Sequence, residues 1–271
     1  MPSNTSISVS QLSRLIGVPG APVIVDVRKA PDYEADTRIL PGARRRDAAA
    51  VAAWAHDLKG KQAVVACQHG GSCSEGAASW LRAEGVQAEV LEGGYEAWRK
   101  AGGPLVKTES LPPRDAQGRT VWVTRARPKV DRIACPWLIR RFVDPDAVFL
   151  FVAQSEVREV AERYGGAAFD IDDTFWSHRG ELCTFDVMVQ ELGLASPVLN
   201  DLAAIIRGAD TARPELAQQA SGMLAMSLGL SRMFRDDLEQ LEAGMLMYDA
   251  FYRWRRDAAE ESHDWPGPMK S

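Results

Sequence analysis

The stretch that decides the fold of the first half of the chain reads Val64-Val65-Ala66-Cys67-Gln68-His69-Gly70-Gly71-Ser72-Cys73-Ser74-Glu75-Gly76-Ala77-Ala78. A short apolar run ends at Cys67, a glycine-bearing loop follows, and a helix rich in small residues begins. A cysteine at such a junction faces several backbone N–H groups and the positive end of a helix dipole. Both favour a negative charge, so we expect the Cys67 thiol to ionise readily and to act as a nucleophile.

Strands and helices alternate on both sides of this stretch. Ser8 and Gln11 have the spacing of a capping box, which predicts a helix start, and the β-branched run at 23–27 predicts a buried parallel strand. The other expected elements are strands at 63–66 and 86–91 and helices at 48–58, 74–84 and 95–101. This order indicates an α/β domain whose parallel sheet carries helices on both faces. Sites in such sheets lie at the carboxyl ends of strands, where Cys67 falls.

The composition narrows the range of functions. With 271 residues and 46% hydrophobic side chains, the chain can bury the cores of two domains. Its net charge of −5 argues against a nucleic-acid partner. No apolar run reaches the roughly 18–20 residues of a membrane span, and the N-terminus lacks the features of a signal peptide. The four scattered cysteines do not form a disulfide framework, so we expect a cytoplasmic protein with reduced thiols. The sequence indicates no particular oligomeric state.

Four segments of the first half carry a family resemblance. They are Val25-Asp26-Val27-Arg28, Ile39-Leu40-Pro41-Gly42-Ala43, the Cys67 loop and Glu92-Gly93-Gly94-Tyr95-Glu96-Ala97-Trp98. In order and spacing they resemble the landmarks of the rhodanese family over residues 5–106, so we place the first domain at 1–106. The resemblance implies a sulfurtransferase in which Cys67 takes a sulfane sulfur from a small-molecule donor such as thiosulfate. The sulfur is held as a persulfide and passed to a thiol or another thiophilic acceptor. It also implies supporting roles for Asp26 and Arg28.

The loop after Cys67 has an expected chemistry of its own. Converging amides stabilise a persulfide anion, so no cofactor is required, and glycines let the backbone fold round the sulfur. Ser72 and Ser74 are expected to cap the following helix, and His69 either steers an anionic donor or makes a structural hydrogen bond. The expected active-site loop comprises Gln68, His69, Gly70, Gly71, Ser72, Cys73 and Ser74.

Two features separate this loop from the commonest rhodanese loop. If Ser74 opens the helix, the loop is one residue longer than usual and resembles those of rhodanese-fold phosphatases and arsenate reductases. Those enzymes follow a Cys-x5-Arg pattern, and here Cys73 stands where the arginine would be. Without that clamp, phosphoryl transfer is disfavoured. Cys73 is either a resolving thiol that attacks the Cys67 persulfide or, as we favour, a small half-buried residue.

A new pattern begins after Gly102-Gly103-Pro104. Residues 107–118 are predicted to be a linker, and residues 119–271 a mostly helical α+β domain. Its expected elements are strands at 121–124, 148–152 and 168–171, helices at 131–142 and 155–164, and one or two amphipathic helices within 228–255.

The second domain carries a resemblance as well. Residues 124–141 are dense in arginine, and Arg207-Gly208-Ala209-Asp210-Thr211-Ala212-Arg213-Pro214 is a second polar cluster. Over residues 119–257 the chain resembles the C-terminal domain of ChrB-type chromate-resistance proteins. That resemblance implies an association with chromate resistance and its regulation, without a mechanism. ChrB proteins carry a different N-terminal region, which weighs against a transcriptional role.

Two clusters in this domain are candidate ligand sites. Arginines between a strand and a helix suit an oxyanion such as chromate or sulfate. The alternative is a set of salt bridges to Asp131, Asp144, Asp146 and nearby carboxylates. The anion-site candidates are Arg125, Arg127, Lys129 and Arg132.

The other cluster lies between residues 170 and 186. Histidine, carboxylate and thiol groups over so short a span could bind a divalent transition metal. A lone histidine in an acidic loop, satisfied by polar neighbours, is the alternative. The metal candidates are His178, Glu181, Cys183 and Asp186, with Asp170, Asp172 and Asp173 nearby.

Three functions follow from these patterns. The first is a sulfurtransferase working through a Cys67 persulfide and associated with oxyanion resistance. The second is an oxyanion or redox sensor that binds without turnover. The third is a thiol-dependent reductase of chromate or arsenate that uses Cys67 and Cys73.

Overall fold

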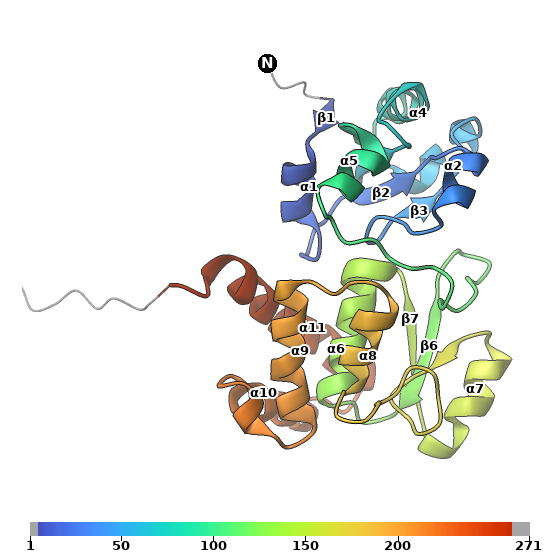
Figure 1. Ribbon diagram of the computed structural model, residues 1–271. Helices are drawn as coiled ribbons and strands as arrows, with labels where there is room; N and C mark the ends of the chain where they lie inside the picture. Colours follow the sequence, from blue (N-terminus) through green and yellow to red (C-terminus); the bar gives the residue numbers. More distant parts are fainter. Residues whose placement is uncertain (1–4, 262–271) are drawn as a thin grey trace, which may run out of the picture.

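A five-stranded parallel sheet forms the centre of the first half of the chain in the computed structural model, which describes residues 5–261 (Figure 1). The strand order is β1-β5-β4-β2-β3, with β1 Ser6–Ile7, β2 Val23–Asp26, β3 Arg44–Arg45, β4 Gln62–Ala66 and β5 Gln87–Leu91. The helices are α1 Val9–Leu15, α2 Ala30–Ala35, α3 Val51–Trp54, α4 Ser72–Ala83 and α5 Gly94–Lys100, with a 3-10 turn at Ala55–Leu58.

Helices cover both faces of this sheet, as the sequence predicts. Val64 and Ala66 of β4 lie in a cluster with Leu12 of α1 and Trp98 of α5. Val65 faces the opposite side, where it joins a second cluster with α3 and α4. This alternation is the period of two expected for a strand, and it leaves the carboxyl end of β4 at the rim of the sheet.

Three local differences from the sequence prediction have simple causes. Strands β1 and β3 have two residues each, too short for a periodic pattern to reveal them. The helix expected at 48–58 begins only at Val51, because the side chain of Asp47 accepts a hydrogen bond from the Ala49 N–H and forms a turn there.

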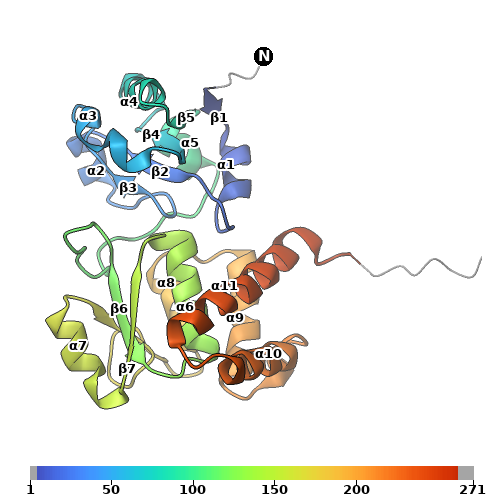
Figure 2. The ribbon, with the colours of Figure 1, turned by 180° about the vertical axis from the view of Figure 1, so that it is seen from behind.

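The second half of the chain contains a three-stranded parallel sheet of order β7-β6-β8. Helix α7 (Val157–Arg163) covers one face, and the other helices gather on the opposite side (Figure 2). The strands are β6 Val121–Arg125, β7 Val148–Val152 and β8 Ala167–Ala168. The remaining helices are α6 Val130–Leu138, α8 Thr184–Glu191, α9 Pro197–Asp210, α10 Ala220–Met233 and α11 Asp237–Arg253. The expected mixed, mostly helical second domain is confirmed.

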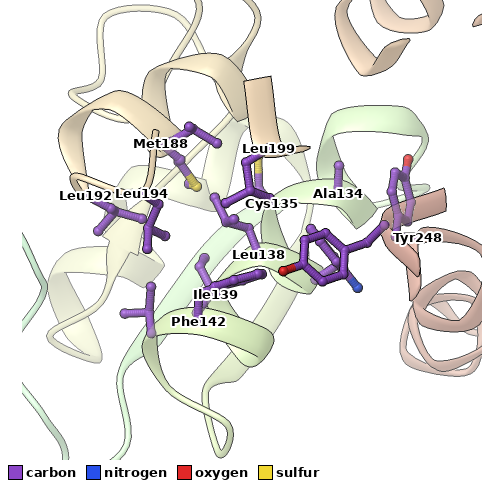
Figure 3. Close-up of a cluster of buried hydrophobic side chains, with 14 of the residues drawn as sticks. Ala134, Cys135, Leu138, Ile139, Phe142, Met188, Leu192, Leu194, Leu199 and Tyr248 are labelled. Atoms are coloured by element: carbon purple, nitrogen blue, oxygen red, sulfur yellow. The ribbon is translucent and has the colours of Figure 1, made fainter. Parts of the chain in front are cut away.

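Helix α6 is the centre of this second core. Its side chains meet those of α8, α9 and α11 in a buried hydrophobic cluster (Figure 3). Trp137 is fully buried among four aromatic rings, and its indole N–H donates to Asp249 at 2.8 Å. A π-helical turn at Ile139–Val143 follows the helix and directs Phe142 toward the first domain.

The two halves share a continuous hydrophobic core. One cluster contains Leu12 and Ile16 of the first half together with Phe142 and Tyr252 of the second. At Gly17 (φ +75°) an added Cβ would lie 2.4 Å from the Phe142 ring, so this contact requires glycine. Polar contacts flank the cluster: the Gly42 N–H donates to the Phe142 carbonyl at 2.6 Å, and Arg44 pairs with Asp144 and Asp146.

Residues 107–118 contain no helix or strand, but they are held at several points. Directly before them, Val106 forms an antiparallel bridge with Ile39. The Lys107 N–H donates to the Leu192 carbonyl at 3.0 Å, and Arg114 pairs with Asp144 at 3.1 Å. Over residues 5–261, no helix is both long enough and apolar enough to cross a bilayer.

Candidate functional site

Cys67 lies directly after β4, at the carboxyl end of the strand, with its side chain almost buried. Helix α4 begins at Ser72 with Gly71 as its N-cap, so only residues 68–71 separate the cysteine from the helix. The sequence prediction that Ser74 opens the helix was therefore wrong, and the extra loop residue counted from Ser74 stays a prediction. The comparison with the longer phosphatase loops rested on the same count and stays a prediction as well.

Two donors lie within reach of the Cys67 sulfur. The Gly71 N–H donates to Sγ at 3.2 Å, and the Ser74 hydroxyl lies 3.1 Å from Sγ. The same hydroxyl is 3.0 Å from the Gly71 carbonyl. It can thus donate to that carbonyl while the thiol is protonated and turn toward the sulfur when a thiolate forms. Ser74 is therefore a sulfur partner, and the expected capping of α4 by Ser72 and Ser74 is not observed: no side chain caps this helix.

These contacts decide the ionisation of the thiol. Burial raises the pKa of Cys67, but hydrogen bonds from the Ser74 hydroxyl and from the N–H groups of Ser74, His69 and Gly71 lower it. The net pKa of Cys67 lies below the ordinary value of a thiol. A lowered pKa increases the thiolate fraction at neutral pH, which is what a nucleophilic cysteine needs.

The neighbouring turn holds the loop in place. The Tyr95 N–H donates to the Cys67 carbonyl at 2.9 Å, and the Glu96 N–H donates to the Gln68 carbonyl at 3.1 Å. At Gly94 (φ +60°) an added Cβ would lie 2.2 Å from the Cys67 carbonyl oxygen and 2.6 Å from the Gly70 nitrogen. Only glycine allows two backbone segments to approach this closely, which accounts for Gly94.

Asp26 and Arg28 brace the rim of the sheet. Both are buried, and the Arg28 guanidinium pairs with the Asp26 carboxylate at 2.7 Å. Arg28 also donates to the carbonyls of Asp36 and Arg38, and its guanidinium lies 3.9 Å from the centre of the Tyr95 ring. The Asp26–Arg28 pair thus supports Tyr95, whose backbone N–H donates to the Cys67 carbonyl. The pair itself makes no contact with the Cys67 sulfur.

The remaining loop residues occupy different environments. Gln68 donates to Glu96 at 3.1 Å, whereas His69 and Ser72 are exposed beside the loop. Cys73 is half-buried and packs against the cluster beneath α4. All four cysteines are free thiols. The contact of Cys73 with this cluster supports its interpretation as a packing residue. Its role as a resolving thiol stays a prediction.

The predicted anion-site residues do not converge on one point. Arg132 and Arg125 both approach Oδ2 of Asp170, at 3.2 and 3.6 Å. Arg127 turns away to the end of α10, where it donates to the carbonyls of Ser231 and Phe234. Lys129 is exposed at the start of α6. The salt-bridge alternative describes Arg125 and Arg132, although their partner is Asp170 and not the carboxylates named from the sequence.

His178 has different partners from those predicted. Its Nε2 atom lies 3.3–3.5 Å from oxygens of Asp131, Asp170 and Asp210. The neighbouring carboxylates of Asp170 and Asp210 raise the pKa of His178 to about 10. Asp131, Asp170 and His178 form the group of the described residues whose ligand atoms come close enough to hold a metal ion.

The other three predicted metal ligands lie outside this group of the described residues. Glu181 is exposed and pairs with Arg213, and Asp186 pairs with Arg207 at 2.6 Å. Cys183 is buried at the start of α8, where burial and the nearby Asp131 carboxylate raise the pKa of its thiol. The predicted set of His178, Glu181, Cys183 and Asp186 is therefore corrected to one that retains His178 alone.

Comparison with known proteins agrees with this division of the chain. Residues 8–101 match the sequence model of the rhodanese-like domain, and residues 122–255 match that of the ChrB C-terminal domain. The chain joins a rhodanese-like domain to a ChrB C-terminal domain. Both resemblances read from the sequence are thereby confirmed.

Individual relatives cover only parts of the chain. Protein ChrB of Cupriavidus metallidurans is 36% identical over 148 residues, which are 53% of this chain and 44% of that protein. The match thus spans less than half of the relative's length.

Two solved structures overlap about a third of the chain. A Rhodopseudomonas palustris protein of unknown function, described as a possible tyrosine phosphatase, is 27% identical over 37% of this chain and 83% of that one, with a TM-score of 0.32. A rhodanese-related protein of Thermoplasma volcanium is 24% identical over 38% of this chain and 97% of that one, with a TM-score of 0.33.

Sequence reasoning missed the partners that the fold brings together in the ChrB C-terminal domain. Asp131 and Asp210 belong to α6 and α9, far from His178 in the chain, and no short spacing connects them. In the rhodanese-like domain it assigned Ser74 to a helix cap, whereas the hydroxyl contacts the sulfur.

Ser74→Ala tests that contact. Loss of the hydroxyl donor raises the pKa of Cys67, so the thiolate fraction at neutral pH falls. We expect iodoacetamide to alkylate Cys67 about tenfold more slowly at pH 7, the effect of losing one hydrogen bond to a charged group. The rate–pH profile should move to higher pH. Ser72→Ala, which alters an exposed neighbour, serves as the control and should leave the profile unchanged. Equal profiles for wild type and Ser74→Ala would show that the hydroxyl does not act on the thiolate.

Proposed function

We propose that this protein is a sulfurtransferase that carries sulfane sulfur as a persulfide on Cys67. The observation that carries the proposal is the position of Sγ, at the end of β4 with the Gly71 N–H and the Ser74 hydroxyl within 3.2 Å. The lowered pKa of Cys67 and the family of the domain support it. We also propose that the sulfur donor is a small molecule such as thiosulfate.

The transfer divides into two displacements. The Cys67 thiolate attacks the outer sulfur of thiosulfate and forms an S–S bond, while the S–S bond of thiosulfate breaks and sulfite leaves with the electron pair. A thiophilic acceptor, cyanide or a cellular thiolate, then attacks the terminal sulfur of the persulfide. The acceptor leaves with that sulfur, and the Cys67 thiolate is restored without net oxidation of the protein.

The residues of the loop hold the charge at each stage. The thiolate and the persulfide are both anions, and the Gly71 N–H and Ser74 hydroxyl donate toward that charge. The Gly94 contact and the Arg28–Asp26 pair keep these donors aimed at the sulfur before the substrate arrives. No metal is needed for either displacement.

The second domain connects this chemistry to oxyanion resistance. Its membership of the ChrB C-terminal family supports an association with chromate resistance. The four cysteines are too few and too scattered for a disulfide framework, which supports a reducing, cytoplasmic setting. In that compartment a cellular thiol is the acceptor of the persulfide sulfur, because glutathione-type thiols are present there and keep it reduced.

Steady-state kinetics with thiosulfate and cyanide test the proposal. We expect thiocyanate to form in each turnover, with the parallel double-reciprocal lines of a two-step covalent mechanism. Wild-type protein that binds thiosulfate or chromate and forms no thiocyanate would favour the sensor. Chromate- or arsenate-dependent oxidation of a supplied thiol, without thiocyanate, would favour the reductase.

A further inference from the structure

A cluster in the ChrB C-terminal domain has features that the persulfide chemistry does not use. Asp131 of α6, Asp170 after β8, His178 in the following loop and Asp210 at the end of α9 meet at one point. Three separate segments of the chain thus bring three carboxylates to one imidazole. The His178 side chain is 40% exposed and that of Asp131 is fully buried, so the cluster opens to solvent on the histidine side.

The distances match ligands around a single ion better than hydrogen bonds. Nε2 of His178 lies 3.5, 3.4 and 3.3 Å from oxygens of Asp131, Asp170 and Asp210. A single N–H cannot donate to three acceptors, and all three distances exceed an ordinary hydrogen bond. Ligands held about 2.1 Å from a metal lie about 3.0–3.4 Å apart at octahedral or tetrahedral angles.

Each carboxylate is also held by a second partner, which in Asp131 and Asp170 contacts the same oxygen that faces His178. Oδ2 of Asp131 accepts the Thr184 N–H at 2.6 Å, and Oδ1 of Asp170 accepts the Thr184 hydroxyl at 2.9 Å. Oδ1 of Asp210 accepts the Asp131 N–H at 3.4 Å. Outer partners of this kind orient the ligands of metal sites.

Asp131 supplies an independent sign of a missing partner. Its Oδ1 atom is buried and has no hydrogen-bond partner among the described residues. This oxygen belongs to the carboxylate whose Oδ2 faces His178, so it lies beside the cluster. A buried carboxylate oxygen without a partner is costly, and a bound cation is one of the few groups that satisfies it.

We propose that Asp131, Asp170 and His178, with Asp210 as a fourth ligand, bind a divalent transition metal. Three carboxylates and one imidazole form an oxygen-and-nitrogen set suited to zinc, manganese or iron(II). Arg125 and Arg132 approach Asp170 through Oδ2, so its Oδ1, which also accepts the Thr184 hydroxyl, is the oxygen that faces the metal position. The two guanidinium groups lie at the rim of the site, where an anion bound to the metal would meet them.

Calorimetric titration of the untagged, full-length, chelator-treated protein tests this site. With Zn²⁺ or Mn²⁺ as the titrant, we expect one ion per chain, and at least tenfold weaker binding by His178→Ala. The matched control is His56→Ala, which removes a histidine whose side chain is 75% exposed and which pairs with Asp57. Asp210→Asn is the second variant: it keeps an acceptor for the Asp131 N–H, removes the charge, and should also weaken binding at least tenfold.

X-ray absorption of the zinc-loaded protein distinguishes the ligand sets. Oxygen and nitrogen scatterers at about 2.0–2.2 Å with no sulfur near 2.3 Å support the proposed site. A sulfur shell would assign the metal to a cysteine and overturn it. So would binding weaker than millimolar in the wild type, or unchanged affinity in both His178→Ala and Asp210→Asn. Cys67→Ser should bind the metal as the wild type does, so failure here is distinct from failure of the sulfurtransferase.

Discussion

Replacing Cys67 with serine is expected to lower the rate of thiocyanate formation by about a thousandfold or more, as the loss of a covalent nucleophile does in other enzymes. The serine hydroxyl is un-ionised at neutral pH, and it cannot form the S–S bond that stores the transferred sulfur. The donors that hold the thiolate, the Gly71 N–H and the Ser74 hydroxyl, stay in place in this variant. The measurement is the initial rate with thiosulfate and cyanide at saturating concentrations.

Cys73→Ser is the matched control for that experiment. Cys73 is half-buried, packs under α4 and lies one residue from the Ser74 sulfur contact. We expect this variant to keep most of the wild-type rate. A comparable loss in Cys73→Ser would require a dithiol mechanism, and a Cys67→Ser protein of near wild-type rate would rule out the persulfide.

Trp137→Ala is expected to have the largest effect on stability. The side chain is fully buried, lies 5.6–6.3 Å from four aromatic ring centres and donates to Asp249. Removing a buried tryptophan costs about 3–5 kcal/mol, a large part of the roughly 5–15 kcal/mol that stabilises a typical protein. Asp249 keeps its pairing with Arg141 at 2.7 Å, so most of the loss comes from the cavity.

Urea unfolding followed by circular dichroism measures this loss. Because one hydrophobic cluster extends from Leu12 to Tyr252, both domains should unfold in a single transition whose midpoint falls in Trp137→Ala. Trp80→Ala, at a side chain 47% exposed, should change the free energy of unfolding by less than about 0.5 kcal/mol. Two separate transitions, with only one displaced by Trp137→Ala, would contradict the shared core.

The rhodanese-like half could be predicted in detail because its signals are local. The capping box of Ser8 and Gln11 is present, and Cys67 lies at the end of a buried strand, as the apolar run before it predicts. The start of α4 could not be predicted. Gly71 adopts an extended conformation as the N-cap, and neither serine gives the usual capping contact, so a capping rule placed the helix start two residues late.

The second domain was harder because its interactions join distant parts of the chain. The amphipathic pattern predicted α6 and α11, which pack against each other. The charged residues of this domain were harder to interpret from the sequence than its apolar residues. Arg127 was predicted to bind an anion, but its guanidinium donates to carbonyls at the end of α10. Likewise, His178 is separated from Asp131 by an entire βαβ unit, and only the fold brings them together.

Mass spectrometry of the intact protein after incubation with thiosulfate tests the central claim most directly. We predict a mass gain of one sulfur atom that maps to the peptide containing Cys67, disappears on addition of cyanide and is absent in Cys67→Ser. A sulfur atom located on another cysteine, or wild-type protein that gains no mass while it still forms thiocyanate, would contradict the account.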